Sequence, residues 1–140
     1  SGYYVGLDYF QHRSVFVVKD NASAAVTYGG TWTHSADSSY FNDTKSVSNV
    51  SGRSSSLVSP GTQVGIFTRK PPRSGMYDVY IDNVFDATVD LYATSAQPAS
   101  RTYSKTGLGS GDHTIRLEVS GQANPNSSGA FIGLDHFDYR

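Results

Sequence analysis

Apolar and polar residues alternate with a period of two along most of this chain, which is the pattern of half-buried β-strands. Segment 76–83 shows the alternation, and after a turn at Asp82-Asn83 the segment 87–92 repeats it, so the two predict an antiparallel hairpin. Segment 113–119 continues the rhythm after a Gly-Ser-Gly-Asp turn. No segment sustains the 3.6-residue period of an amphipathic helix, so any helix should be a single turn.

The same alternation recurs at 15–19, 25–28 and 63–68, which brings the expected total to about eight strands. Clusters of Pro, Gly, Ser, Asn and Asp predict the loops between them, at 33–56, 69–75, 93–105 and 121–128. Many short strands joined by polar turns indicate an all-β fold. We therefore expect an antiparallel two-sheet β-sandwich or jelly roll.

The length and the charge of the chain exclude several classes of function. The chain has 140 residues, a formal net charge of -1 and no cysteine, so one domain without disulfides or thiolate metal sites is expected. A net charge near zero gives no basic field for a phosphate backbone, and we do not expect a nucleic-acid partner. No apolar run approaches the roughly 20 residues that cross a bilayer, so no membrane insertion is expected.

The two ends of the chain carry an internal repeat. Segment 2–13 matches segment 129–140 at six of twelve positions, and the copies stand 127 residues apart, about one module. We interpret residues 1–13 as the closing strand of a preceding repeat in a tandem array and residues 14–140 as the complete module. The alternative is that both ends belong to one module and pair as antiparallel neighbours.

Several ordered motifs carry a family resemblance; they lie at 26–33 (Val-Thr-Tyr-Gly-Gly-Thr-Trp-Thr), 77–82, 87–92, 107–114, 119–121 and 127–129. With these motifs the chain resembles the galactose-binding-domain-like modules attached to secreted microbial glycoside hydrolases. It departs from them at Asp82-Asn83, where such modules commonly have Asp-Gly, and at 69–75, where a Gly-rich loop is more usual. The second departure leaves the identity of the ligand open.

The resemblance implies a non-catalytic, carbohydrate-binding jelly roll that targets a larger protein, secreted or at the cell surface, to a glycan or polysaccharide. The partners implied are that glycan and an attached catalytic domain or neighbouring repeats. A structural or adhesive repeat of a cell-surface protein is the alternative, because the tandem signature suits it equally. Surface aromatic residues gathered at one end would favour sugar binding, and their uniform burial would favour a spacer.

Sugar binding needs flat aromatic faces for the C–H face of a pyranose and planar polar groups for its hydroxyls. We expect the site at loop ends, since loops tolerate irregular backbone and the outward strand faces show no continuous aromatic row. The expected ligand-binding residues are Trp32, His34, Tyr40, Arg69, Arg73, Tyr92 and Asn124. Trp32 could instead pack at the sandwich edge, and the two arginines would favour an anionic sugar if they bind one. Loops alternate between the two ends of a sandwich, so part of this set must be wrong.

An enzyme is not expected. A glycosidase needs two facing carboxylates, and the candidate pairs, Asp78 with Asp82 and Asp86 with Asp90, repeat along strands where charge is ordinary. No Gly-x-Ser-x-Gly elbow is followed by a helix, and no His-x-x-x-His pair offers zinc ligands. His113 lies in phase with apolar neighbours and is expected to be structural.

Calcium is the one cofactor expected, because related sandwiches often hold a structural ion between the chain ends. Asp8 and Asp135, with backbone carbonyls, are its predicted oxygen ligands. An aspartate inside an otherwise apolar strand needs a partner, although hydrogen bonding to a neighbouring loop would also serve.

Overall fold

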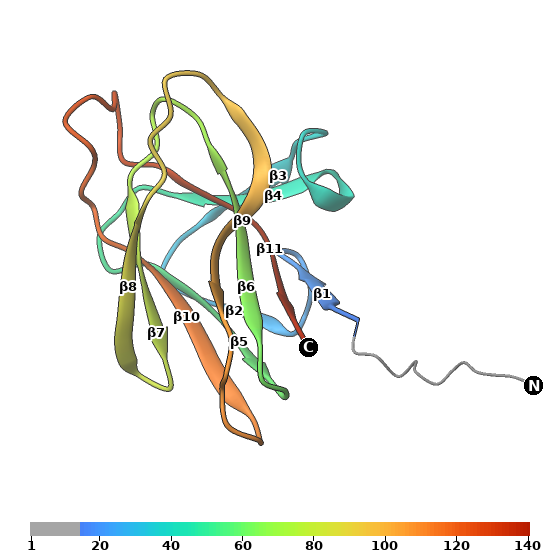
Figure 1. The fold of residues 1–140 in the computed structure, drawn as a ribbon. Coiled ribbons are helices and arrows are strands. Elements are labelled where there is room, and N and C mark those ends of the chain that lie inside the picture. The colour runs from blue at the N-terminus through green and yellow to red at the C-terminus, as the bar shows by residue number, and fades with distance from the viewer. Residues whose placement is uncertain (1–14) are drawn as a thin grey trace, which may run out of the picture.

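The computed structural model describes residues 15–140 and shows two antiparallel sheets packed face to face (Figure 1). The first sheet has the order β3 (Thr33–Ala36), β4 (Thr44–Ser48), β11 (Ile132–Tyr139), β6 (Val64–Lys70) and β9 (Gln97–Lys105), with β1 (Val17–Asp20) paired to β11. The second has the order β2 (Val26–Gly29), β5 (Ser54–Ser59), β10 (His113–Val119), β7 (Met76–Ile81) and β8 (Val84–Asp90). One 3-10 turn, η2 (Phe41–Asp43), precedes β4. The predicted two-sheet sandwich is confirmed.

The core lies between the inward faces of the two sheets. Ile66 and Phe137 of the first sheet and Tyr77 and Leu117 of the second are among its fully buried side chains. Each such side chain stabilises the fold by roughly 1.5–3 kcal/mol. The Tyr77 hydroxyl lies 2.7 Å from Thr102 Oγ1, and burial raises the pKa of Tyr77, so this phenol stays neutral.

Two segments that were predicted to be loops contain strands, so the expected number of strands was too low. Segment 33–56 contains β3, β4 and the start of β5, and segment 93–105 contains β9, so the described residues form eleven strands rather than about eight. The first error arose because serines occupy inward positions: Ser46, Ser48 and Ser55 are all buried. The second arose from Pro98, which an edge strand such as β9 tolerates.

The predicted hairpin of β7 and β8 is present, and its turn is well suited to Asp82-Asn83. Both residues have positive φ, 52° and 67°, a conformation that Asp and Asn adopt more readily than most residues. Asp82 Oδ1 accepts a hydrogen bond from the Thr114 amide, and Asp82 Oδ2 lies 2.7 Å from His113 Nδ1. His113 Nε2 lies 2.6 Å from the Gly109 carbonyl, so both ring nitrogens face acceptors. These contacts agree with the predicted structural role of His113.

The Asp82–His113 pair should make the stability depend on pH. The hydrogen bond to Asp82 raises the pKa of His113, so its contribution is complete below about pH 6.5 and is lost as the pH rises through the raised value. The same bond lowers the pKa of Asp82, so the contribution is present above about pH 4 and is lost on acidification below it. We expect the melting temperature of the parent to exceed that of His113→Asn by the largest amount between about pH 4 and pH 6.5. A difference that is constant up to pH 9 would contradict the account.

The repeat at the chain ends stays a prediction. Residues 1–13, including Asp8, lie outside the described residues, so neither interpretation of that segment is tested. Within the described part, β1 pairs antiparallel with β11, from Val17 opposite Tyr139 to Asp20 opposite His136. In Figure 1, β1 lies beside the C-terminal end of β11.

Candidate functional site

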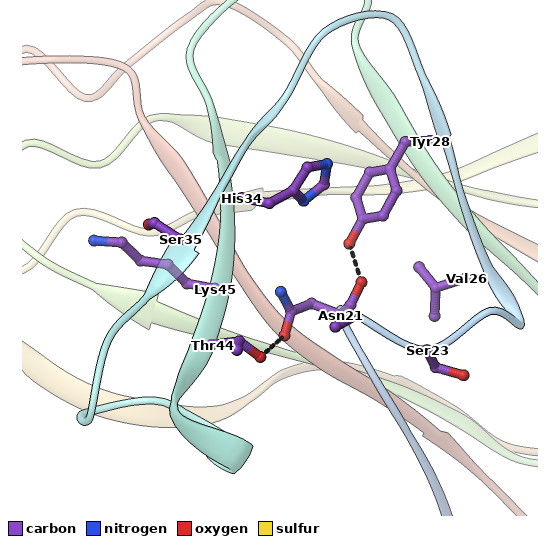
Figure 2. Close-up of a pocket in the computed structure, with 9 residues that line it drawn as sticks. Asn21, Ser23, Val26, Tyr28, His34, Ser35, Thr44 and Lys45 are labelled. Carbon is purple, nitrogen blue, oxygen red and sulfur yellow. Dashed lines mark hydrogen bonds between the residues drawn. The ribbon is translucent and has the colours of Figure 1, made fainter.

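A pocket of about 460 Å³ opens at one side of the sandwich, where the edge strands β2 and β3 of the two sheets come together (Figure 2). This volume lies in the range of small-molecule sites. The turn after β1 supplies Asn21, β2 supplies Val26 and Tyr28, β3 supplies His34, and β4 supplies Thr44 and Lys45. Ala22, Ser23 and Ser35 complete the lining.

Ser46 is the centre of the hydrogen-bond network that shapes the pocket. Its hydroxyl lies 2.9 Å from Asn21 Nδ2, 2.9 Å from the Tyr28 hydroxyl and 2.7 Å from His34 Nδ1. Asn21 is held in turn, because its side-chain oxygen accepts from Thr44 Oγ1 at 2.9 Å. Ser46 and Asn21 are both buried, so a serine in an inward strand position fixes three side chains of the pocket.

The Tyr28 hydroxyl is the donor in two contacts, to the Asn21 carbonyl oxygen at 2.6 Å and to Ser46 Oγ at 2.9 Å. Ser46 Oγ also accepts from Asn21 Nδ2, and it lies 2.7 Å from His34 Nδ1, where the tautomer of His34 decides which atom donates. No described residue hydrogen bonds to His34 Nε2, which leaves this nitrogen for a ligand hydroxyl.

The Tyr28 ring forms the apolar wall. It meets Trp32 edge to face, with ring centroids 5.4 Å apart, and His34 in the same manner at 4.7 Å. Figure 2 shows the Tyr28 and His34 rings side by side above Asn21. Burial raises the pKa of Tyr28, so the wall is uncharged at neutral pH. An aromatic wall beside a fixed imidazole and an amide is suited to a polar ligand with one apolar face.

One side of the rim is charged but internally paired. Lys45 Nζ lies 3.1 Å from Asp37 Oδ2. Hydrogen bonds from the hydroxyl and amide of Ser39, together with Lys45, lower the pKa of Asp37 to about 2. This pair brings no net charge to the pocket.

The structure does not bring the predicted binding residues together at one site. His34 lines the pocket, whereas Trp32 packs behind Tyr28 in the core and is only 7% exposed. The arrangement agrees with the packing alternative for Trp32. The other five predicted residues lie elsewhere: Tyr40, Arg69, Arg73, Tyr92 and Asn124.

Tyr40 and Arg69 lie together on the outer side of the first sheet, with the Arg69 guanidinium carbon 5.8 Å from the Tyr40 ring. Burial raises the pKa of Tyr40 to about 12, and the positive charges of Arg69 and Arg73 oppose this rise. Tyr92 and Asn124 share Asp90, which accepts from the Tyr92 amide and from Asn124 Nδ2, both at 2.9 Å. A role for these residues in ligand binding stays a prediction.

The outer face of the first sheet does carry a row of planar groups, contrary to the sequence prediction. Phe67 stacks on His136 at 4.1 Å with 19° between the rings, and Phe41 lies 5.0 Å from His136. The Arg101 guanidinium carbon is 5.0 Å from the Phe67 ring and 4.2 Å from the Phe16 ring. The pattern missed the row because its members come from separate segments. Since these rings stack on one another, their faces are engaged in packing.

The sequence analysis predicted only His34 among the nine lining residues, and it missed Ser46, which holds three of them in place. Asn21 and Ser46 are small polar residues of the kind that marks loops, and Tyr28 fell in a predicted strand without a distinguishing feature. The available signal was the run Tyr28-Gly-Gly-Thr-Trp-Thr-His34, which puts three aromatic rings within seven residues.

Asp135, the one predicted calcium ligand among the described residues, has hydrogen-bonding partners of its own. Asp135 is buried; one carboxylate oxygen accepts from the Phe41 amide at 2.8 Å, and the other lies 3.3 Å from His136 Nδ1. Among residues 15–140, no group of three or more His, Asp or Glu side chains could hold a metal ion. Hydrogen bonding to a neighbouring turn is thus available to Asp135. Calcium stays a prediction, and its other proposed ligand, Asp8, lies outside the described residues.

No family model matches the chain. Two curated relatives come from Flavonifractor plautii. One is named "A type blood N-acetyl-alpha-D-galactosamine deacetylase" and is 27% identical over 103 residues, 74% of this chain and 13% of the relative. The other is named "A type blood alpha-D-galactosamine galactosaminidase" and is 30% identical over 120 residues, 86% of this chain and 10% of the relative. The chain thus spans about a tenth of the length of these relatives.

Solved structures show the same fold at low sequence identity. A family 35 carbohydrate-binding module from Clostridium thermocellum aligns over 89% of this chain and 98% of its own length, with a TM-score of 0.60 and 13% identity. The CBM36-1 domain of a multidomain xylanase from the hindgut metagenome of Trinervitermes trinervoides aligns over 89% and 95%, with a TM-score of 0.59 and 16% identity. The chain therefore has the jelly-roll fold of carbohydrate-binding modules, as the resemblance implied.

Proposed function

We propose that this chain is a non-catalytic carbohydrate-binding module that holds a sugar in the pocket between β2 and β3. The observation that carries the proposal is the Ser46-centred network, which fixes an aromatic wall and an imidazole with one unpaired ring nitrogen at one small pocket. The fold of stand-alone carbohydrate-binding modules supports it. So do the two relatives named as glycan-acting enzymes, since the chain matches only a small part of each.

In this account a sugar ring places its C–H face against Tyr28 and Val26. One of its hydroxyls forms a hydrogen bond with His34 Nε2. The Ser35 hydroxyl, which also lines the pocket, is available to a second sugar hydroxyl. The lining bears no net charge, because its Lys45 is paired with Asp37, so the ligand that fits best is a neutral monosaccharide unit or chain end.

The carboxylates that could serve a glycosidase have other roles. Hydrogen bonds from His113 and Thr114 lower the pKa of Asp82, and those from Lys105 and Tyr103 lower the pKa of Asp86. Neither can supply the proton that a glycosidase acid must hold at neutral pH. Asp78 accepts from Thr88, and Asp90 accepts from Tyr92 and Asn124. These contacts support a binding role without catalysis.

The setting we propose is a larger extracellular or cell-surface protein in which this module brings a catalytic domain to its glycan. The small share of each relative that the chain matches supports attachment to further domains. No helix within residues 15–140 is long and apolar enough to span a membrane.

A calorimetric screen of neutral sugars tests the proposal. It should include galactose, N-acetylgalactosamine, and mannan and xylan oligosaccharides. We expect saturable binding of at least one, with Kd between about 10 μM and 1 mM, and no release of reducing sugar. Absence of binding across the panel would overturn the proposal in favour of a structural spacer, and hydrolysis abolished by one Asp or Glu substitution would overturn the absence of catalysis.

A further inference from the structure

We propose that a second, smaller pocket, built around Arg53 and Phe131, binds the anionic group of an acidic sugar. This pocket has a volume of about 190 Å³ and lies at the other end of β3 and β4 from Lys45. Thr31, Thr33, Ser48 and Asn49 line it together with Arg53 and Phe131. The inference rests on the proposed function only in that the ligand is a glycan.

The Arg53 side chain is fixed in place before any ligand arrives. Its stem packs against Gly30, where a Cβ atom would overlap it, and Gly30 has a positive φ of 81°. Its backbone is held on both sides, because the Arg53 amide donates to the Val50 carbonyl and the Arg53 carbonyl accepts from the Val119 amide. A guanidinium held in this way loses little conformational entropy when it binds.

The charge of Arg53 is not balanced by a carboxylate. None of the ion pairs among residues 15–140 includes Arg53, and no described side chain accepts a hydrogen bond from it. Its Nε is buried without a partner. A buried donor that is left unpaired costs roughly 1–3 kcal/mol. An acceptor supplied by a ligand would therefore find a donor that the protein itself leaves unsatisfied.

A second cation lies beside the same pocket. The Arg73 guanidinium carbon is 5.4 Å from the Phe131 ring, and Phe131 itself is fixed by backbone hydrogen bonds to Arg73 and Gly75. No ion pair within the described part of the chain includes Arg73 either. Two guanidinium groups near one aromatic side chain select a negative charge attached to an apolar ring.

The chemistry that fits is a carboxylate or sulfate ester carried on a sugar ring. The guanidinium fork matches either group with two parallel N–H bonds, while the Thr31 and Thr33 hydroxyls can serve the sugar hydroxyls. The neutral pocket at His34 differs from this one in its charge, so the two would take different units of a glycan. A chain that contains both neutral and acidic sugars would engage both pockets.

Calorimetric titrations of four probes test the inference: galactose, galacturonate, galactose 6-sulfate and inorganic sulfate. The parent protein should bind the two acidic sugars, with affinity that falls as salt rises. Arg53→Gln keeps most of the stem over Gly30 and should lose about tenfold or more in affinity for both acidic sugars. The same variant should bind the neutral sugar found in the neutral screen as the parent does. Arg116→Gln is the matched control, because Arg116 lies 4.2 Å from the Tyr80 ring on the other sheet and should leave all affinities unchanged.

Each outcome has a distinct meaning. A galacturonate response without a sulfate-ester response identifies a carboxylate site, and the reverse identifies a sulfate site. Acidic sugars that bind equally well to Arg53→Gln overturn this inference and leave the proposed function intact. Failure of every sugar, neutral and acidic, overturns both. If Arg53→Gln does not fold, the titration of the parent is followed by NMR: shifts of the Thr31 and Phe131 amides support the inference, and shifts confined to other residues contradict it.

Discussion

Trp32→Ala should lower the free energy of unfolding by about 3–5 kcal/mol. Trp32 is 7% exposed and belongs to the hydrophobic core, where it meets the Tyr28 ring at 5.4 Å. Its truncation leaves a cavity beneath the pocket, and the surrounding strands can relax into it only in part. The effect is therefore one of packing, although Trp32 was among the residues predicted from the sequence to bind ligand.

Denaturant unfolding of Trp32→Ala and of two control variants, Trp32→Phe and His34→Ala, measures this loss of stability. The buried indole Nε1 of Trp32 has no hydrogen-bond partner in the described structure, so Trp32→Phe loses no such bond and should cost clearly less than Trp32→Ala. His34→Ala, at an exposed position, should change stability by less than about 1 kcal/mol. A Trp32→Ala variant as stable as the parent but unable to bind sugar would show that Trp32 is a ligand platform after all.

Tyr28→Ala should reduce the affinity for the neutral sugar by about 2 kcal/mol, roughly 30-fold. The substitution removes the aromatic wall and also leaves the Asn21 carbonyl and the Ser46 hydroxyl without a shared partner. Tyr28→Phe keeps the wall and loses only the hydroxyl, so its loss of affinity should be smaller.

The matched control is Tyr92→Ala. Tyr92 is also a half-buried tyrosine, but it lies at the loop after β8, where its amide donates to Asp90. It should leave the affinity unchanged when measured by calorimetry on folded protein. Loss of binding in Tyr92→Ala, with Tyr28→Ala unaffected, would move the site to the loop end predicted from the sequence.

The period-two pattern was sufficient to predict those strands that bury Val, Ile, Leu or Tyr, as at Tyr77, Val79 and Ile115. It failed where serine takes the inward positions. Ser55 and Ser59 flank Leu57 in β5, and all three are buried, yet two of them have the composition of a loop. A hydroxyl can be buried at modest cost when a neighbour satisfies it, as Asn21 and Tyr28 do for Ser46.

The candidate site was harder to predict for the same reason. His34 was identified because histidine is chemically conspicuous, but the residues that position it, Ser46 and Asn21, belong to segments 12 and 13 residues away along the chain. Their meeting depends on the pairing of β3 with β4 and on the turn after β1. The pattern of neighbouring residues carries no information on which strands pair or in which register. The pocket could therefore be recognised only from the assembled sheets.

The most direct test of the central claim is an NMR titration with the sugar that binds most tightly in the neutral screen. The account predicts that the largest amide shifts fall in the lining of the pocket, at Asn21, Ala22, Tyr28, His34 and Thr44. It also predicts that the Nε2 resonance of His34 shifts when the sugar binds. Shifts confined to the loops at 71–75, 91–96 and 121–131, with His34 unchanged, would contradict it.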